Sequence, residues 1–273
     1  MTGVSDTILV DRSDGLVTVT FNRPERKNAI APDQWPLLDE IITEVWQSPD
    51  DRALILTGAG GNFSSGADLS SAGSTRARDD SDEGGAREVE STLYEMRRVN
   101  EITLRLHRMA KPTIAAVDGV AVGVALGLAL ACDLVVASDR ARFGAVFAKR
   151  GLTVDGGTSW TLPRLVGARR AKQIALFGDM VSADQALEWG MVNEVVSADE
   201  LSAFAAEWGR RLASGPTTAL SLIKRMLDAS STLTFEQALE EEARSAHIAY
   251  TTTDLIEGMT AFFERREPRF TGR

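Results

Sequence analysis

One acidic residue stands in surroundings that would suit it for moving protons. Asp155 lies in the segment 151–165 among glycines and apolar residues, and Gly156 and Gly157 follow it directly. Burial in such surroundings would raise the pKa of its carboxyl group toward a value useful for a general base. Asp is also a common helix cap, and a helix could begin near Gly156. On the residues alone, capping is the favoured interpretation, because acids in apolar surroundings mark functional sites only with some probability.

A glycine-rich turn in the segment 58–69 could present backbone N–H groups to a ligand. It follows an expected strand, but Phe63 stands where the last glycine of a dinucleotide-binding GxGxxG motif belongs. No Gly-Lys-Ser/Thr follows, as a P-loop would require. The alternative is a turn whose free N–H groups, especially near Ala67, point at an acceptor oxygen. A plain loop explains the same residues.

Small residues fill the segment 119–127, around the start of an expected helix. They would let another backbone approach closely and would leave the first N–H groups of the helix free. A buried packing helix explains the same composition and is favoured by it. These three segments hold the residues with which the chain could do chemistry, so the elements between them must bring them together.

The first half of the chain alternates between strands and helices. Two β-branched runs flank Asp14-Gly15 and predict a hairpin of residues 8–10 and 16–21. The elements predicted after it are a helix at 32–47, strand 53–57, helix 88–109, strand 113–117, helix 123–131 and strand 134–137. This rhythm predicts an α/β fold with parallel crossovers. Between residues 70 and 85 we expect a flexible loop, since apolar side chains are nearly absent there.

After Gly167 the pattern becomes helical. The predicted helices are 168–177, 182–189, 198–213, 216–229, 235–250 and 254–265. Two of them start with capping boxes, at Ser182 with Gln185 and at Thr234 with Gln237. An α/β part followed by helices predicts a core with a C-terminal helical region, of the kind used for oligomerisation or as a lid.

Composition and charge limit the class of protein. The chain has 273 residues, 44% hydrophobic and 25% charged, as in ordinary globular proteins. Its net charge of −9 argues against nucleic acid or an anionic membrane as partner. A single cysteine, Cys132, excludes an intramolecular disulfide, and two histidines argue against a His/Cys metal cage. The apolar stretch 119–132 is too short to span a bilayer, and residues 1–11 lack signal-peptide features. We therefore expect a reduced, cytoplasmic protein.

Ordered motifs along the chain resemble the successive signatures of one family. They are residues 23–30 (RPERKNAI), 63–69 (FSSGADL), 111–119 (KPTIAAVDG) and, at the end, 261–268 (AFFERREP). With these motifs the chain resembles the crotonase superfamily, the enoyl-CoA hydratase/isomerase group, over essentially its whole length. The resemblance implies a particular fold, assembly and substrate.

The implied fold is α/β, a crotonase-like spiral of repeated ββα units with a C-terminal helical trimerisation region. Residues 1–200 would form the spiral core with the CoA and active sites, and residues 201–273 the helical oligomerisation or lid region. The implied assembly is a homotrimer or a hexamer built as a dimer of trimers.

The resemblance also implies an acyl-CoA thioester substrate whose carbonyl lies between two backbone N–H groups. By position these belong to Ala67 and Val124. Family members usually carry Gly or Ala at the second position, so Val124 is a departure: it keeps the N–H donor but narrows the pocket. Two such donors would stabilise the enolate oxyanion that forms when a thioester loses a proton.

The acids depart from the hydratase pattern. Family hydratases hold and activate water with two glutamates, and this sequence has Gly127 and Phe147 at the matching positions, so hydration by that route is not expected. The segment 151–157 (GLTVDGG), with Trp160, looks instead like a subgroup of double-bond isomerases with a single Asp base. This subgroup includes the phenylacetate-pathway isomerases of epoxyphenylacetyl-CoA and 3-enoyl-CoA esters. The resemblance therefore favours Asp155 as a catalyst that moves a proton from C2 to C4, flanked by Phe147 and Trp160.

The resemblance assigns the contacts with coenzyme A as well. The implied residues are Lys27 and Ala29 near the adenine and phosphates, Ser65, Gly66 and Asp68 along adenine and pantetheine, and Arg265 reaching a phosphate from a neighbouring subunit. Solvated surface charge explains Lys27 and Arg265 equally well, and Asp68 fits a turn residue better than a catalyst. Coenzyme A would enter as part of the substrate, with no metal and no tightly bound cofactor. A hydratase or other crotonase-type enzyme, and a non-catalytic acyl-CoA-binding protein, remain alternatives.

Overall fold

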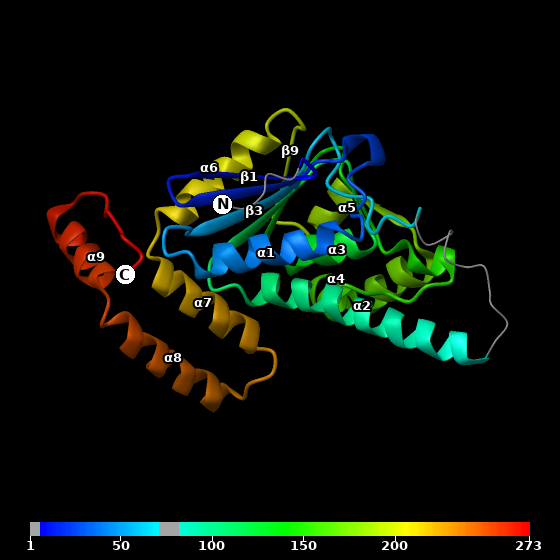
Figure 1. The fold of residues 1–273 in the computed structure, drawn as a ribbon. Coiled ribbons are helices and arrows are strands. Elements are labelled where there is room, and N and C mark those ends of the chain that lie inside the picture. Colours follow the sequence, from blue (N-terminus) through cyan, green and yellow to red (C-terminus); the bar gives the residue numbers. More distant parts are fainter. Residues whose placement is uncertain (1–5, 71–81) are drawn as a thin grey trace.

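The structure of the protein is a computed structural model that describes residues 6–70 and 82–273, with side chains from residue 93 onward in the second segment. Within these residues the strands form two sheets (Figure 1). The larger sheet has the order β1 (Ile8–Ser13), β2 (Leu16–Phe21), β3 (Ala53–Gly58), β4 (Thr113–Val117), β6 (Leu134–Ser138) and β9 (Glu194–Val196). The smaller sheet has the order β5 (Val120–Val122), β7 (Arg142–Gly144) and β8 (Met180–Ser182).

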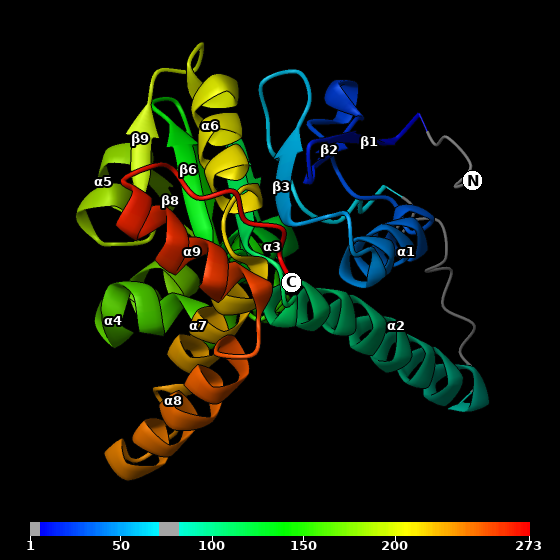
Figure 2. The same ribbon diagram turned by 90° about the vertical axis from the view of Figure 1, so that its left-hand side faces the viewer.

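Helices cover the sheets and extend beyond them (Figure 2). They are α1 (Gln34–Gln47), α2 (Asp82–Arg108), α3 (Val124–Ala131), α4 (Thr158–Phe177), α5 (Ala183–Glu188), α6 (Leu201–Ala213), α7 (Thr217–Ala229), α8 (Phe235–Ala249) and α9 (Thr253–Glu264), with short 3-10 helices at Pro24–Arg26 and Val146–Arg150. Both predicted capping boxes, at Ser182 and Thr234, are formed.

In two successive repeats the chain passes through both sheets. Strand β4 joins the large sheet and β5 the small one before α3, and β6 and β7 do the same before α4. Strands β2, β3, β4, β6 and β9 pair in parallel, whereas β1 pairs antiparallel with β2. The predicted hairpin and the predicted parallel crossovers are therefore confirmed, and the repeats have the ββα order.

Strand β3 shows how the large sheet is covered on both faces. Leu54 and Leu56 belong to the core cluster formed with α1, α2 and α3, whereas Ala53 and Ile55 belong to the cluster formed with α6. Successive side chains of a strand point to opposite faces, which explains this alternation. Helix α6 therefore packs on the sheet itself, and the predicted division between residues 200 and 201 separates this helix from the sheet that it covers.

Helix α4 begins at Thr158 and consists of two helical segments that meet at Gly167, so the predicted helix 168–177 is confirmed as the second segment, whereas the first segment, residues 158–166, was not predicted. Pro163 and Gly167 lie inside α4, and both residue types usually end or kink a helix. Pro163 is accommodated, while Gly167, with φ 78° and ψ 156°, marks a kink between two helical segments. The extra turns matter for function because they bring the helix start next to Asp155.

Two further differences concern short or polar segments. Strands β5, β7, β8 and β9 were not predicted, since each spans three residues, too few for a periodic pattern. Helix α2 begins at Asp82 and not at Glu88, so the expected flexible loop is shorter at its end. The rest of that loop, residues 71–81, lies outside the described residues.

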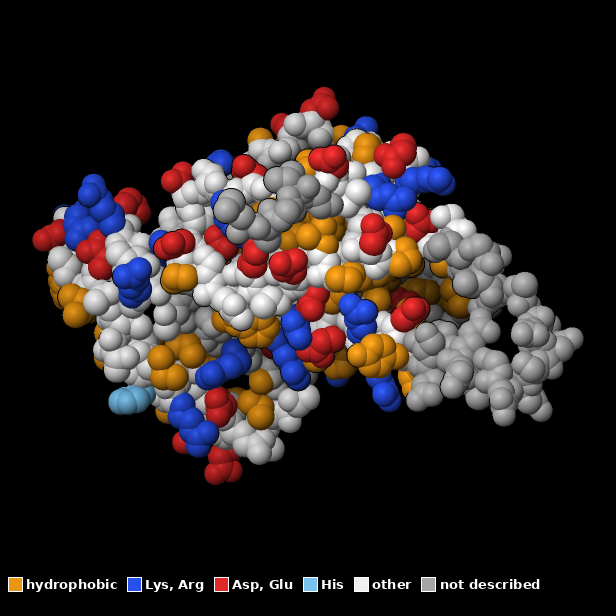
Figure 3. Space-filling model, in the orientation of Figure 1, with side chains coloured by type: hydrophobic (Ala, Val, Ile, Leu, Met, Phe, Trp, Pro, Cys, Tyr) orange, Lys and Arg blue, Asp and Glu red, His pale blue; other side chains and the backbone are white. Residues whose placement is uncertain are grey.

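Helices α7, α8 and α9 form a region that projects from the sheets, at the lower left of Figure 1. Exposed apolar side chains gather on it, some of them visible at the lower left of Figure 3. They include Ile223, Leu227, Phe235, Leu239, Ile248, Ile256, Met259, Phe262 and Phe263. Apolar surface of this kind marks interaction sites. In the part of the chain that the structure describes, no helix is long and apolar enough to span a membrane.

Candidate active site

Asp155 lies in the turn that leads into α4, and its side chain does not cap this helix. The N-cap residue is Gly157, and no side chain accepts a hydrogen bond there. The backbone carbonyl of Asp155 accepts the N–H of Thr158 at 3.0 Å, whereas the carboxylate Oδ1 accepts no hydrogen bond from the described residues. Glycines at 156 and 157 adopt positive φ angles of 56° and 78°, which L-residues with side chains rarely adopt. The capping interpretation is therefore wrong.

Asp155 is half-buried, and one oxygen of its carboxylate is fully buried without a partner among the described residues. Its Oδ1 atom accepts no hydrogen bond from the described residues. Burial raises the pKa of Asp155 from 3.8 to about 6, because charge is costly to hold away from water. Asp155 is thus ionised at neutral pH and still more basic than an ordinary aspartate. This combination suits a group that takes a proton and gives it back.

Ala67 offers an unused backbone N–H group. The residues on either side of it are fixed to Ile30: Gly66 accepts the N–H of Ile30 at 2.8 Å, and Asp68 donates to the carbonyl of Ile30 at 2.8 Å. The N–H of Ala67 donates to no described residue, and Ala67 is exposed. A backbone held rigidly on both sides can therefore present one free donor to a ligand.

Val124 offers a second unused N–H group. It is the first residue of α3, where the opening N–H groups have no partner within the helix. Gly123 before it is fixed by its N–H, which donates to Gly144 at 2.9 Å, but no bond from Val124 N is formed within the described chain. The partial positive charge of the helix N-terminus adds to the attraction for a negative oxygen.

Close backbone approaches bring these three groups together. A Cβ atom built on Gly66 would lie 2.7 Å from the carbonyl oxygen of Val122 and 3.8 Å from Cα of Gly123. A Cβ atom built on Gly156 would lie 3.0 Å from Cγ2 and 3.3 Å from the carbonyl oxygen of Val124. The segment before Ala67 thus touches the segment before Val124, and the residue after Asp155 touches Val124 itself.

Phe147 and Trp160, the predicted flanking residues, lie in different environments. Phe147 is 6% exposed, and a Cβ on Gly123 would meet its ring at 3.9 Å, so it lies beside the start of α3. Trp160 is 40% exposed; its ring meets His107 edge-on at 5.4 Å and carries the Arg164 guanidinium 4.0 Å from its centroid. Phe147 therefore borders the donor at Val124, whereas the ring contacts of Trp160 join α4 to α2.

The predicted coenzyme A residues Lys27 and Ser65 lie side by side. The carbonyl of Lys27 accepts the N–H of Ser65 at 2.9 Å, and the hydroxyl of Ser65 donates to the carbonyl of Arg26 at 3.3 Å. Lys27 is exposed, and the carbonyl of Ala29 accepts a hydrogen bond from Arg23 at 2.8 Å. The two predicted binding segments thus form one continuous surface next to Ala67.

Asp68 has a structural environment. Hydrogen bonds from Ser70, together with an ion pair to Arg23 at 3.0 Å, lower the pKa of Asp68 to about 2. A carboxylate held in this way is a poor base. Arg265, the C-cap residue of α9, is exposed and lies away from α3 within one chain (Figure 1).

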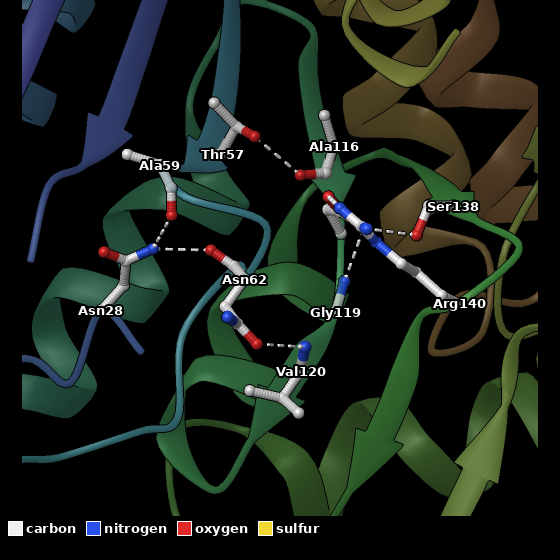
Figure 4. Close-up of polar contacts among 10 residues, drawn as sticks. Asn28, Thr57, Ala59, Asn62, Ala116, Gly119, Val120, Ser138 and Arg140 are labelled. Atoms are coloured by element: carbon white, nitrogen blue, oxygen red, sulfur yellow. Dashed lines mark hydrogen bonds and ion pairs between the residues drawn. The ribbon is translucent and has the colours of Figure 1, made fainter. Parts of the chain in front are cut away.

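Two polar networks that the sequence did not reveal hold the loops of the site (Figure 4). Asn28 is 1% exposed; it donates to the carbonyls of Ala59 and Asn62 at 2.8 and 2.6 Å and so fixes the glycine-rich turn. Asp118 accepts hydrogen bonds from Ser138 and Arg140, each at 2.7 Å. Asn28 lies within the motif 23–30, yet neither its type nor its spacing indicates these distant partners.

Comparison with known proteins shows the family of the chain. The profile of a family described as enoyl-CoA hydratase/isomerase matches residues 11–273. The chain belongs to this family. The resemblance drawn from the sequence motifs is therefore confirmed.

Individual family members with different activities resemble the chain. It is 38% identical to the 1,2-epoxyphenylacetyl-CoA isomerase of Escherichia coli (strain K12), covering 97% of this chain and 98% of the relative. It is 36% identical to 4-chlorobenzoyl coenzyme A dehalogenase-2 of Arthrobacter sp, covering 87% and 83%. It is 32% identical to the short-chain-enoyl-CoA hydratase of Clostridium acetobutylicum, covering 95% of each.

A solved structure shares the fold as well. The enoyl-CoA hydratase of Bacillus anthracis matches with a TM-score of 0.89 at 28% identity, covering 98% of this chain and 100% of that one. The protein described by our structure therefore has the predicted crotonase fold. Since its relatives include an isomerase, a dehalogenase and a hydratase, the reaction must be argued from the site.

Proposed function

We propose that this protein shifts a double bond in an enoyl-CoA thioester, with Asp155 as the group that carries the proton. The supporting observation is the buried Oδ1 of Asp155, which has no partner among the described residues and belongs to a turn packed on Val124. A structural carboxylate at this depth would be paired, because an unpaired buried charge is costly. An unpaired one is available to a substrate.

The proposed reaction needs a proton transfer and a stabilised oxyanion. The thioester carbonyl accepts hydrogen bonds from the N–H groups of Ala67 and Val124. Asp155 takes a proton from C2 of a 3-enoyl ester, and the electron pair of the broken C–H bond moves into a dienolate whose oxygen is held by the two donors. The protonated Asp155 then returns the proton to C4, which leaves the double bond between C2 and C3. One donor of this type contributes on the order of 10²–10³ in rate.

The same residues argue against hydration. The resemblance places the two water-activating glutamates of hydratases at positions 127 and 147, and this chain has Gly127 and Phe147 there. Neither side chain accepts a proton, and the Phe147 ring is buried beside α3. Hydration would then require a water held in another way, which makes it the alternative reaction to be tested.

Coenzyme A would lie along the surface formed by Lys27, Ala29, Ser65, Gly66 and Asp68. Asp68 would contribute through its backbone, since its carboxylate is engaged by Arg23 and Ser70. Arg265 would reach a phosphate in a neighbouring subunit of a trimer or of a dimer of trimers. The exposed apolar residues of α7–α9 support such an assembly.

The test replaces the carboxylate and follows product mass. A 3-enoyl-CoA ester is incubated with wild type and with Asp155→Asn; isomerisation leaves the mass unchanged, whereas hydration adds one water. We expect Asp155→Asn to lose about 10²–10⁴ in rate while it still binds a saturated acyl-CoA in calorimetry. Asp51→Asn is the matched control, because Asp51 is a buried aspartate before β3, paired with Arg12.

Three outcomes would overturn the proposal. Undiminished turnover by Asp155→Asn would remove the assigned base. Addition of water to crotonyl-CoA by the wild type, without isomerisation of the 3-enoyl ester, would show that the protein is a hydratase. Binding of acyl-CoA without any conversion would indicate a non-catalytic binding protein.

A further inference from the structure

We propose that Gly127 is a positioning residue: by carrying no side chain, it lets the turn 155–157 rest on α3 and so fixes Asp155 relative to the N–H of Val124. This inference rests on the proposed function. The resemblance to hydratases indicates only that position 127 lacks their glutamate. The inference assigns the glycine at this position a role in placing Asp155.

The contact between Gly127 and the turn has no spare room. A Cβ atom built on Gly127 would lie 2.2 Å from the carbonyl oxygen, 2.8 Å from the carbonyl carbon and 3.1 Å from Cα of Gly156. These are backbone atoms, which cannot rotate away as the end of a side chain could. Any residue other than glycine must therefore push the turn and α3 apart.

The same turn is held at two more points. Gly156 meets Val124, which is three residues before Gly127 and therefore on the same face of α3. On the other side, a Cβ on Gly157 would meet Cγ2 of Thr103, from α2, at 3.7 Å. The turn thus lies between two helices, and the tightest of the three approaches is the one at Gly127.

This arrangement connects the two parts of the chemistry. Val124, at the start of α3, supplies a donor for the oxyanion, and Gly156 follows the base directly in the chain. The backbone contact of Gly127 with Gly156 therefore sets the separation between base and donor. A misplacement of about 1 Å at a catalytic group can cost about 10²-fold in rate.

The test is Gly127→Ala, assayed for kcat and KM with a 3-enoyl-CoA ester and for the pKa of Asp155 by ¹³C NMR. We expect kcat to fall about 10²-fold with KM changed by less than about threefold, since most binding groups of the substrate lie elsewhere. The pKa of Asp155 should move down from about 6 toward 3.8 as the lifted turn exposes the carboxylate. A loss of stability alone would not move this pKa.

Gly209→Ala is the matched control. Gly209 lies in α6 on the other face of the sheet, where a Cβ would meet methyl carbons of Leu16 and Ile55 at 2.8 and 2.9 Å. It should change thermal stability and leave both kcat and the pKa of Asp155 unchanged. Wild-type values of kcat and pKa in Gly127→Ala, or equal losses in Gly209→Ala, would overturn the inference.

A second pair of variants covers the case in which Gly127→Ala does not fold. Gly156→Ala places a methyl group 3.0 Å from Cγ2 of Val124, and Val124→Ala removes that atom while keeping the N–H. We expect the double variant to be at least tenfold more active than Gly156→Ala alone. An equal activity of the two would contradict the role of this contact. If the wild type does not isomerise, the proposed function fails, but the pKa of Asp155 still tests Gly127.

Discussion

Two Asp-Gly turns of this protein each have a glycine with a positive φ angle, but their aspartates lie in opposite electrostatic environments. Gly119 and Gly156 have φ angles of 54° and 56°. The carboxylate of Asp118 accepts four hydrogen bonds, from the Gly119 N–H at 2.8 Å, from the Ser138 hydroxyl and Arg140 Nε at 2.7 Å, and from Arg140 Nη2 at 2.6 Å. Oδ1 of Asp155 accepts none from the described residues.

The difference teaches that the partners, and not the turn, decide what an aspartate can do. Arg140 and Ser138 lower the pKa of Asp118, because they stabilise the charged form. Burial alone raises the pKa of Asp155 to about 6. The first carboxylate is occupied with holding a loop, whereas the second is free to exchange a proton. Each experiment below sharpens this contrast or breaks it.

The largest expected effect is on the pH dependence of the reaction. In the proposed reaction Asp155 is a base only when ionised, so kcat/KM should fall tenfold for each pH unit below about 6. From its plateau value at neutral pH, kcat/KM should have fallen roughly hundredfold at pH 4. Initial rates with a 3-enoyl-CoA ester from pH 4 to 8 measure this acid limb of the pH–rate profile. Circular dichroism at each pH checks that the enzyme stays folded. A rate that stays level down to pH 4 would show that an ordinary carboxyl group, or none, limits the reaction.

Much of the difference between the environments of Asp118 and Asp155 could not be predicted from the sequence. The motif around residues 151–157 was enough to select Asp155, and periodicity was enough for the hairpin, most helices and both capping boxes. The pairing of Asp118 with Arg140 joins loops after different strands, and only the register of β4 and β6 brings them together. The close fit of Gly127 on Gly156 is likewise a contact between distant segments, which appears in sequence only as two small residues.

Local patterns failed where tertiary contacts override propensity. Pro163 marks a helix end by its type, yet the first segment of α4 continues past it as far as the kink at Gly167. The three-residue strands of the small sheet carry too little pattern to predict, although β5 leads directly to Gly123 and Val124. The elements nearest the site were therefore the ones that sequence periodicity described least well.

An intermediate effect is expected from Asp118→Ala. The substitution removes hydrogen bonds to a charged group, so the free energy of unfolding should fall by about 2 kcal/mol. Urea denaturation at pH 7 measures this loss. The midpoint of the acid limb of kcat/KM should stay near that of the wild type, because the environment of Asp155 is unchanged. A shifted midpoint would mean that the two turns are coupled and would break the comparison.

The smallest effect is a gain in stability for Asp155→Asn. The folded-state pKa of Asp155, about 6, lies above the 3.8 of an unperturbed carboxyl. The folded protein therefore binds more protons than the unfolded chain between these values, and its free energy of unfolding falls as the pH rises through this window. Asparagine carries no charge and escapes that loss. We expect the variant to be more stable by about 1 kcal/mol at pH 7, after allowance for solvent screening.

The pH dependence of this gain separates it from a packing effect. The gain builds up as the pH rises from 3.8 to about 6, so most of it should be absent at pH 4, where the folded-state carboxyl is protonated. Urea denaturation of both proteins at pH 7 and pH 4 gives the comparison. A variant that is less stable at pH 7 would show that the ionised carboxylate makes favourable contacts after all, and Asp155 would then resemble Asp118, a structural anion unsuited to carry a proton between two carbons.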